Sequence, residues 1–128
     1  MKHQDHEHSI RGFAGKTPQL GQGVFVDATA LVIGDVVIDD NSSIWPFALI
    51  RGDMHSIRIG KRTSIQDGAI CHITHAGPFN EQGWPLNIGD DCTIAHGVIL
   101  HGCTLGNRIL VGMGSIIMDG AIIADDVV

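Results

Sequence analysis

Three histidines in the second half of the chain, His72, His96 and His101, are the residues whose types and spacing point most directly to chemistry. Imidazole nitrogens are common zinc ligands, and a catalytic zinc ion usually has three protein ligands and one position open to water. His72 and His101 are far apart in the sequence, so no single turn or helix brings them together. A metal site here therefore requires a scaffold that returns the chain repeatedly to the same edge.

Such a scaffold is indicated by a six-residue repeat of aliphatic side chains. Fourteen of fifteen repeat positions hold Ile, Val or Leu, and twelve of the fifteen residues that stand fifth in each hexad are small or slim. The first positions are Val26, Val32, Ile38, Ile44, Ile50, Ile59, Ile65, Cys71, Ile88, Ile94, Leu100, Leu105, Val111, Ile117 and Ile123. With three hexads per triangular coil, the pattern predicts an all-β parallel β-helix of about five coils. A sandwich of alternating strands explains neither the six-residue step nor the scarcity of aromatic residues.

The composition agrees with this fold class and excludes several functions. The 128 residues are 44% hydrophobic but only 5% aromatic, and they include 17 glycines. A net charge of −6 argues against a nucleic-acid partner. No apolar run reaches the roughly 18 residues of a membrane span, and the polar start is no signal peptide. Three cysteines without CxxC spacing predict no disulfide framework, so we expect a cytoplasmic protein.

Two segments interrupt or precede the repeat. Residues 1–20 are predicted to be an N-terminal extension, partly disordered or tag-like, and its histidine cluster is interpreted as a solvated tail. The β-helix domain is predicted over 21–128. Residues 76–87, with two prolines and two glycines, are predicted to form a protruding loop.

Counting coils places the candidate ligands. Hexads three apart lie on the same face, so Arg51, His72 and His101 share one place on successive coils, about 4.8 Å apart. Asp67 and His96 share a place on the preceding face, and Gln66 is next to Asp67 in sequence.

His96 lies five residues before His101, roughly 16 Å along an extended chain that ends in a corner. Zinc–nitrogen bonds of roughly 2.0–2.1 Å cannot span that distance within one chain. The three histidines can share a metal only if His96 comes from a neighbouring subunit, which predicts a closed ring, most simply of three copies.

Ordinary structural roles are the alternatives for each residue. A single histidine at a solenoid turn is usually solvated, and it is the stacking of two that argues for a ligand pair. Arg51 and Asp53 could form a surface ion pair worth less than about 1 kcal/mol. Cys71 takes an inward aliphatic place and is interpreted as core.

Taken together, these residues resemble the γ-class carbonic anhydrases, and their order and spacing are most similar to the short bacterial members of that family. The resemblance covers residues 18–128. It rests on Ile50-Arg51-Gly52-Asp53, Ser64-Ile65-Gln66-Asp67-Gly68, His72, Ala95-His96 and Leu100-His101-Gly102. It implies a left-handed β-helix and a homotrimer with a zinc site, or an iron or cobalt site, at each subunit interface.

The resemblance also implies roles. His72 and His101 would come from one subunit and His96 from the next. Arg51 and Asp53 correspond to the family's intersubunit ion pair, and Gln66 and Asp67 to groups near the metal-bound water. Zinc lowers the pKa of its water to about 7, so the implied reaction is attack of hydroxide on carbon dioxide to give bicarbonate.

The sequence departs from the best-known archaeal members at two points. Acidic residues that serve proton transfer there are replaced by Met54 and His75, so we expect weak or absent hydratase activity unless His75 or His55 moves the proton. Family members also usually continue into a C-terminal helix, which is absent up to Val128, and we therefore expect a fragment of a longer chain.

Three other functions remain open at this stage. A hexapeptide acyltransferase shares the fold and often uses one histidine as a general base. A thioester hydrolase could use the same metal site. A metal-binding trimer without catalysis is the third, because the fold alone does not decide function.

Overall fold

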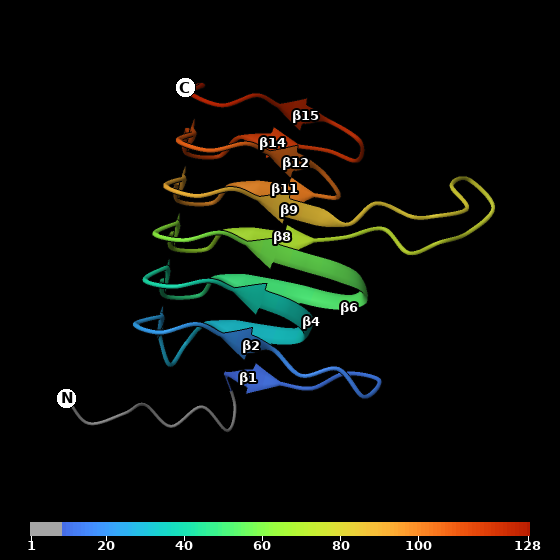
Figure 1. The fold of residues 1–128 in the computed structure, drawn as a ribbon, viewed down its shortest axis with the longest axis horizontal. Helices are drawn as coiled ribbons and strands as arrows, with labels where there is room; N and C mark the ends of the chain where they lie inside the picture. The colour runs from blue at the N-terminus through green and yellow to red at the C-terminus, as the bar shows by residue number, and fades with distance from the viewer. Residues whose placement is uncertain (1–8) are drawn as a thin grey trace.

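A computed structural model describes residues 9–128, which form a parallel β-solenoid of about five turns with no helix in that range (Figure 1). The first eight strands are β1 (Ile10–Arg11), β2 (Gln19–Leu20), β3 (Phe25–Val26), β4 (Leu31–Ile38), β5 (Ser43–Ile44), β6 (Leu49–Ile59), β7 (Ser64–Ile65) and β8 (Ile70–His72). The remaining seven are β9 (Leu86–Ile88), β10 (Thr93–Ile94), β11 (Ile99–His101), β12 (Thr104–Leu105), β13 (Leu110–Val111), β14 (Ile116–Ile117) and β15 (Ile122–Ile123).

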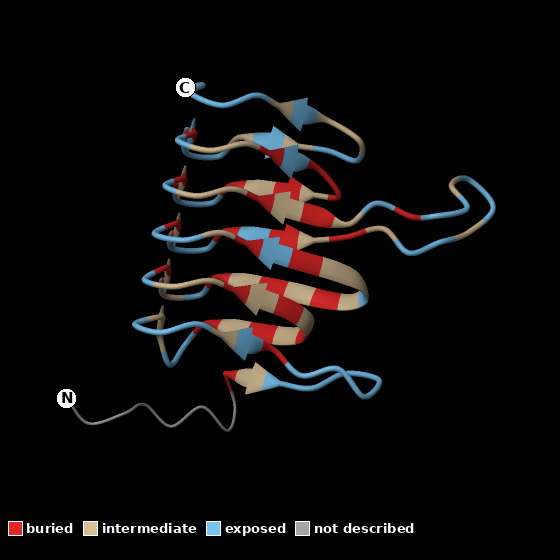
Figure 2. Ribbon diagram, viewed as in Figure 1, coloured by how far each residue is buried: buried red, intermediate tan, exposed pale blue. Residues whose placement is uncertain are grey.

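The register of these strands stacks the predicted aliphatic places directly on one another. On one face β3, β5, β7, β10 and β13 pair in parallel, which aligns Val26, Ile44, Ile65, Ile94 and Val111 in a single column. Each of these side chains is at most 5% exposed. The other two faces share the long strands β4 and β6, which run around a corner of the coil. Figure 2 shows the resulting alternation of buried and partly exposed residues along the strands.

The solenoid begins within the stretch that the sequence assigned to the N-terminal extension. β1 and β2 both pair with β4, with Ile10 opposite Val32 and Leu20 opposite Ile38. Ile10 and Leu20 pack against the core and cover the first coil. A tight turn at Phe13–Lys16 breaks the six-residue step between them, which hides this coil from the repeat pattern. The N-terminal histidine cluster lies outside the described residues.

The two interruptions of the repeat leave the inner column intact. The pairing places Val36 opposite Ile57, and Ile57 opposite Leu86, and all three are at most 1% exposed. The inward place is therefore filled after each insertion, while Met54 and His75, which precede the insertions, are exposed. Each insertion bulges outward because the buried column must stay continuous.

The second insertion forms a hairpin between β8 and β9 that extends far from the solenoid (Figure 1). Antiparallel bridges join Thr74 to Trp84 at its base and Gly77 to Asn80 nearer its tip. This hairpin takes up most of the predicted loop 76–87, but the last two residues of that range, Leu86 and Asn87, belong to β9.

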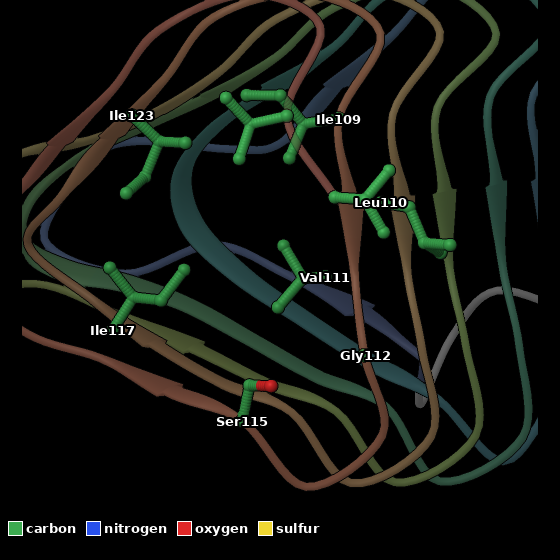
Figure 3. A pocket seen from close by; sticks show the side chains of 9 residues that line it. Ile109, Leu110, Val111, Gly112, Ser115, Ile117 and Ile123 are labelled. Carbon is green, nitrogen blue, oxygen red and sulfur yellow. The ribbon is translucent and has the colours of Figure 1, made fainter.

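The last described coil ends in an open apolar pocket of about 220 Å³ (Figure 3). Its lining residues are Ile109, Leu110, Val111, Gly112, Ser115, Ile117, Ile123, Val127 and Val128. Between residues 9 and 128 the chain holds no helix long and apolar enough to cross a membrane.

Candidate metal centre

The strands β8 and β11 bring His72 and His101 together on successive coils. They are neighbours in the sheet, and their register pairs His72 with His101, as the coil count predicts. The two rings meet edge to face with centroids 5.1 Å apart. Nδ1 of His72 lies 3.2 Å from Nε2 of His101. One nitrogen from each ring therefore points at the other.

A separate carboxylate binds the far nitrogen of each ring. Asp53 Oδ1 lies 3.0 Å from His72 Nε2, and Asp119 Oδ1 lies 2.7 Å from His101 Nδ1. A carboxylate that accepts a hydrogen bond keeps the proton on the ring nitrogen it contacts, which leaves the other nitrogen with a free lone pair. The two carboxylates thus favour the tautomers in which the facing nitrogens, Nδ1 of His72 and Nε2 of His101, are both acceptors.

Two facing lone pairs fit a cation. With no proton between them, nitrogens 3.2 Å apart repel each other, and a positive ion shared by both removes that repulsion. Two nitrogens on one tetrahedral zinc ion, at roughly 2.0–2.1 Å each, lie about 3.3 Å apart. The separation of the facing nitrogens is close to that value. The donor set, its spacing and the two supporting carboxylates therefore fit zinc.

The surroundings of His72 favour its neutral form. Burial lowers the pKa of His72 below its ordinary value of 6.5, and the charge of Arg51 acts in the same direction, against the hydrogen bond to Asp53. A metal ligand must be unprotonated, so this direction supports binding. For Asp53, burial opposes ionisation, but hydrogen bonds from His72 and Arg51 outweigh it and lower the pKa of the carboxyl.

Asp119 is held in the same way on the other side of the pair. Burial alone would raise the pKa of the Asp119 carboxyl, but hydrogen bonds from Thr74 and His101 outweigh burial, so the pKa lies below its ordinary value. The Thr74 hydroxyl donates to Asp119 Oδ2 at 2.6 Å. Asp119 is therefore an anion with both oxygens engaged.

Arg51 donates to Asp53 within the same chain, so this carboxylate joins the arginine to His72. The intersubunit ion pair implied by the resemblance stays a prediction. The Arg51 side chain is 43% exposed, whereas that of Asp53 is 13% exposed.

His96 and Asp67 stack on a different corner, as predicted. The backbone nitrogen of Gly97 donates to the carbonyl of Asp67, and His96 Nδ1 lies 3.5 Å from Asp67 Oδ1. Both side chains are about half exposed, at 55% and 52%. Gln66, next to Asp67, is half-buried, and its side chain makes no hydrogen bond to the described residues.

The described chain does not bring His96 to the histidine pair. Among residues 9–128, no group of three or more His, Cys, Asp and Glu side chains is placed to hold a metal ion. The described chain thus brings His72 and His101 together, and His96 presents an exposed imidazole on another corner.

Asp119 and Thr74 were missed in the sequence. Asp119 lies one coil above His101, but the coil count puts Met118 in the place over that histidine and Asp119 over Gly102, so the direction of the Asp119 side chain could not be predicted from the count. Thr74 takes the fourth place of the hexad that begins at Cys71 and lies at the base of the hairpin. Its contact with Asp119 depends on how the insertion leaves the solenoid.

Comparisons with known proteins agree with the fold. Residues 17–52 match the model of the bacterial transferase hexapeptide family (six repeats). The chain is 54% identical over 110 residues to Protein YrdA of Escherichia coli, covering 86% of this chain and 60% of YrdA. It is 35% identical over 122 residues to the mitochondrial γ-carbonic anhydrase 2 of Arabidopsis thaliana, covering 95% of this chain and 44% of that protein. A crystal structure from Bacillus cereus, provisionally named an acetyltransferase, superimposes with a TM-score of 0.79 at 37% identity, covering 90% of this chain and 63% of that one.

The coiled fold and these matches define a hexapeptide-repeat protein. Within that class, the chain is 35–42% identical to proteins named γ-carbonic anhydrase or carbonic anhydrase. The chain spans about three fifths or less of the length of these curated relatives.

Proposed function

We propose that this protein is a metal-dependent carbonic anhydrase of the γ class, which hydrates carbon dioxide to bicarbonate at sites between the subunits of a homotrimer. The observation that carries the proposal is the facing pair of ring nitrogens, 3.2 Å apart, each backed by its own carboxylate. His96 of a neighbouring copy would supply the third ligand. The kinship with γ-carbonic anhydrases supports the same assignment.

Zinc bound by these three histidines, or iron or cobalt in its place, would lower the pKa of a water ligand to about 7 and so supply a nucleophile at neutral pH. Asp53 and Asp119 would hold the far ring protons and fix the direction of both imidazoles. The side-chain amide of Gln66 has no partner among residues 9–128, so it would orient the nucleophile by a hydrogen bond. Asp67 would hold the imidazole of His96.

Proton release is assigned to His75 rather than to His55. The backbone nitrogen of Ser56 donates to His55 Nδ1, so His55 Nε2 carries the proton and donates it to the carbonyl of Gln82. Both nitrogens of His55 are therefore engaged. His75 is exposed on the hairpin and can exchange protons with solvent.

The test begins with metal content. Purified wild-type trimer is expected to hold one zinc per chain, and His96→Ala should lose it. His75→Ala is the matched control, because it removes an exposed histidine outside the ligand set and should keep its zinc. Wild-type trimer without zinc, or His96→Ala with its full complement, would contradict the proposed site.

Activity is then measured on the same samples by stopped-flow hydration of carbon dioxide. The His75→Ala variant is expected to slow turnover at neutral pH while retaining zinc, and equal rates would exclude His75 as the proton carrier. An acyl-CoA assay on the metal-loaded protein separates the remaining alternatives. Acyl transfer or thioester hydrolysis without hydration would favour those functions, and zinc without any turnover would favour a metal-binding trimer.

A further inference from the structure

The projecting hairpin is fixed to the coils that carry the candidate metal centre. Its base is closed by two backbone hydrogen bonds between Thr74 and Trp84. Trp84 lies over two stacked glycines, Gly102 and Gly120, which are joined by a hydrogen bond at 2.9 Å. A methyl group added to Gly120 would come within 3.1–3.3 Å of the Trp84 ring, and one added to Gly102 within 2.7 Å of Trp84 Cβ. The indole therefore needs both glycines in order to lie where it does.

These two glycines are the sequence neighbours of the metal-site residues. Gly102 follows His101, and Gly120 follows Asp119. A side chain at Gly102 would also meet Asp119 Oδ1 at 2.5 Å. The hairpin, the carboxylate and the candidate ligand thus share one small contact region.

A continuous hydrogen-bonded path runs through that region. Thr74 Oγ1 donates to Asp119 Oδ2 at 2.6 Å, and Asp119 Oδ1 lies 2.7 Å from His101 Nδ1. Thr74 belongs to the hairpin, Asp119 to the turn that follows β14, and His101 to β11. Within the described residues, Thr74 is the one side chain apart from His101 that bonds the Asp119 carboxylate, so it determines how that carboxylate faces the imidazole.

We propose that the hairpin sets the metal affinity of the centre through Asp119: Thr74 orients the carboxylate, and Asp119 positions His101 with its Nε2 lone pair toward the ion. The inference rests on the proposed metal site and assigns Asp119 and Thr74 as positioning residues. Because binding coupling is reciprocal, a bound metal must in turn favour the docked hairpin.

Metal affinity is the first readout, measured by competition of apo protein with a chromogenic chelator for zinc. Asp119→Asn is expected to weaken zinc binding by about 10–100-fold, as loss of a carboxylate behind a ligating histidine usually does. Thr74→Val keeps the shape of the side chain and removes only the hydroxyl, and the loss of this one hydrogen bond should weaken binding by about threefold to tenfold. Thr104→Val is the matched control, since Thr104 is exposed and its side chain makes no hydrogen bond in the described chain, and its affinity should equal that of wild type.

Limited proteolysis of the hairpin is the second readout. Phe79 is fully exposed near the hairpin tip, and chymotrypsin cleavage after it can be followed by mass spectrometry. Zinc is expected to slow this cleavage in wild type and in Thr104→Val, and to slow it less in Thr74→Val. A role of Thr74 in fold stability alone would change cleavage equally with and without zinc.

The outcomes separate this inference from the proposed function. Wild-type protein that binds no zinc overturns both. Wild-type protein that binds zinc through His96, together with unchanged affinity in Asp119→Asn and Thr74→Val, overturns the inference and leaves the metal site standing. If Asp119→Asn does not fold, Thr74→Val decides by its affinity and by its cleavage rates.

Discussion

Mixing two inactive variants tests whether the metal centre is divided between subunits. His72→Ala removes a nitrogen from the facing pair, and His96→Ala removes the ligand proposed to come from the next copy. Each variant alone lacks one ligand at every interface, so neither should retain zinc or hydrate carbon dioxide. Mixed trimers, prepared by co-expression, bring an intact His72–His101 pair beside an intact His96.

The expected recovery of zinc and activity follows from the order of the chains, because each interface takes the His72–His101 pair from one chain and His96 from the next. A trimer with both kinds of chain has a single interface at which the pair comes from a His96→Ala chain and the third ligand from a His72→Ala chain. Random assembly makes about three quarters of the trimers mixed, so the sample should recover about one quarter of the wild-type zinc and rate. The control mixture, His72→Ala with His101→Ala, should recover none, because both changes damage the same half of the site.

The assay combines native mass spectrometry, to count the mixed trimers, with metal analysis and stopped-flow hydration. Mixed trimers that hold no more zinc than the single variants would refute the divided site. Recovery in the control mixture would refute the assignment of His72 and His101 to the same half.

Three further predictions concern the scaffold. Ile65→Ala should lose about 2–5 kcal/mol of unfolding free energy, measured by urea denaturation, because Ile65 is fully buried. Ile122→Ala, at an exposed site, should lose about 0.5 kcal/mol or less, and similar losses in the two variants would contradict the assigned core. Burial raises the pKa of Cys71 to about 12, so a thiol reagent at about pH 8 should label it only in unfolded protein, and rapid labelling of native protein would count against this packing. A hydrogen bond from Arg62 lowers the pKa of Asp91, so wild type should be more stable than Asp91→Asn at neutral pH and should lose this advantage as the pH falls through the lowered pKa. Thermal melts of both proteins at neutral pH and at a pH below that pKa should show the change, and a difference in melting temperature that stays constant would contradict it.

The regular part of the fold could be predicted because one physical requirement repeats every six residues. Ile44, Ile65 and Ile94 each fill the same narrow interior, and the sequence shows that requirement directly. The first coil could not be predicted in this way. Ile10 and Leu20 fill inward places too, but a turn of irregular length separates them and leaves no constant step to detect.

The same distinction explains what was found and missed at the candidate site. The contact between His72 and His101 depends only on coil spacing, so the coil count predicts it. Their supporting groups depend on side-chain direction and on the insertions. Asp53 reaches His72 from the start of one bulge, and Thr74 reaches Asp119 from the base of the hairpin. Neither bulge has a repeat that could specify its path.

Uniform aliphatic columns give a repetitive chain little means of choosing the correct partner coil. A slip by one whole coil would bury nearly the same Ile and Val side chains. The second places of the hexads on the metal-site face are different, because they hold Arg51, His72, His101 and Met118 on successive coils. The kind of side chain thus changes along this column, unlike in the aliphatic columns. A slipped chain would oppose unlike residues and separate the two histidines. Residues suited to hold a metal thus also distinguish correct from incorrect coil pairing, so the metal content of a preparation would report the fraction of molecules that folded in register.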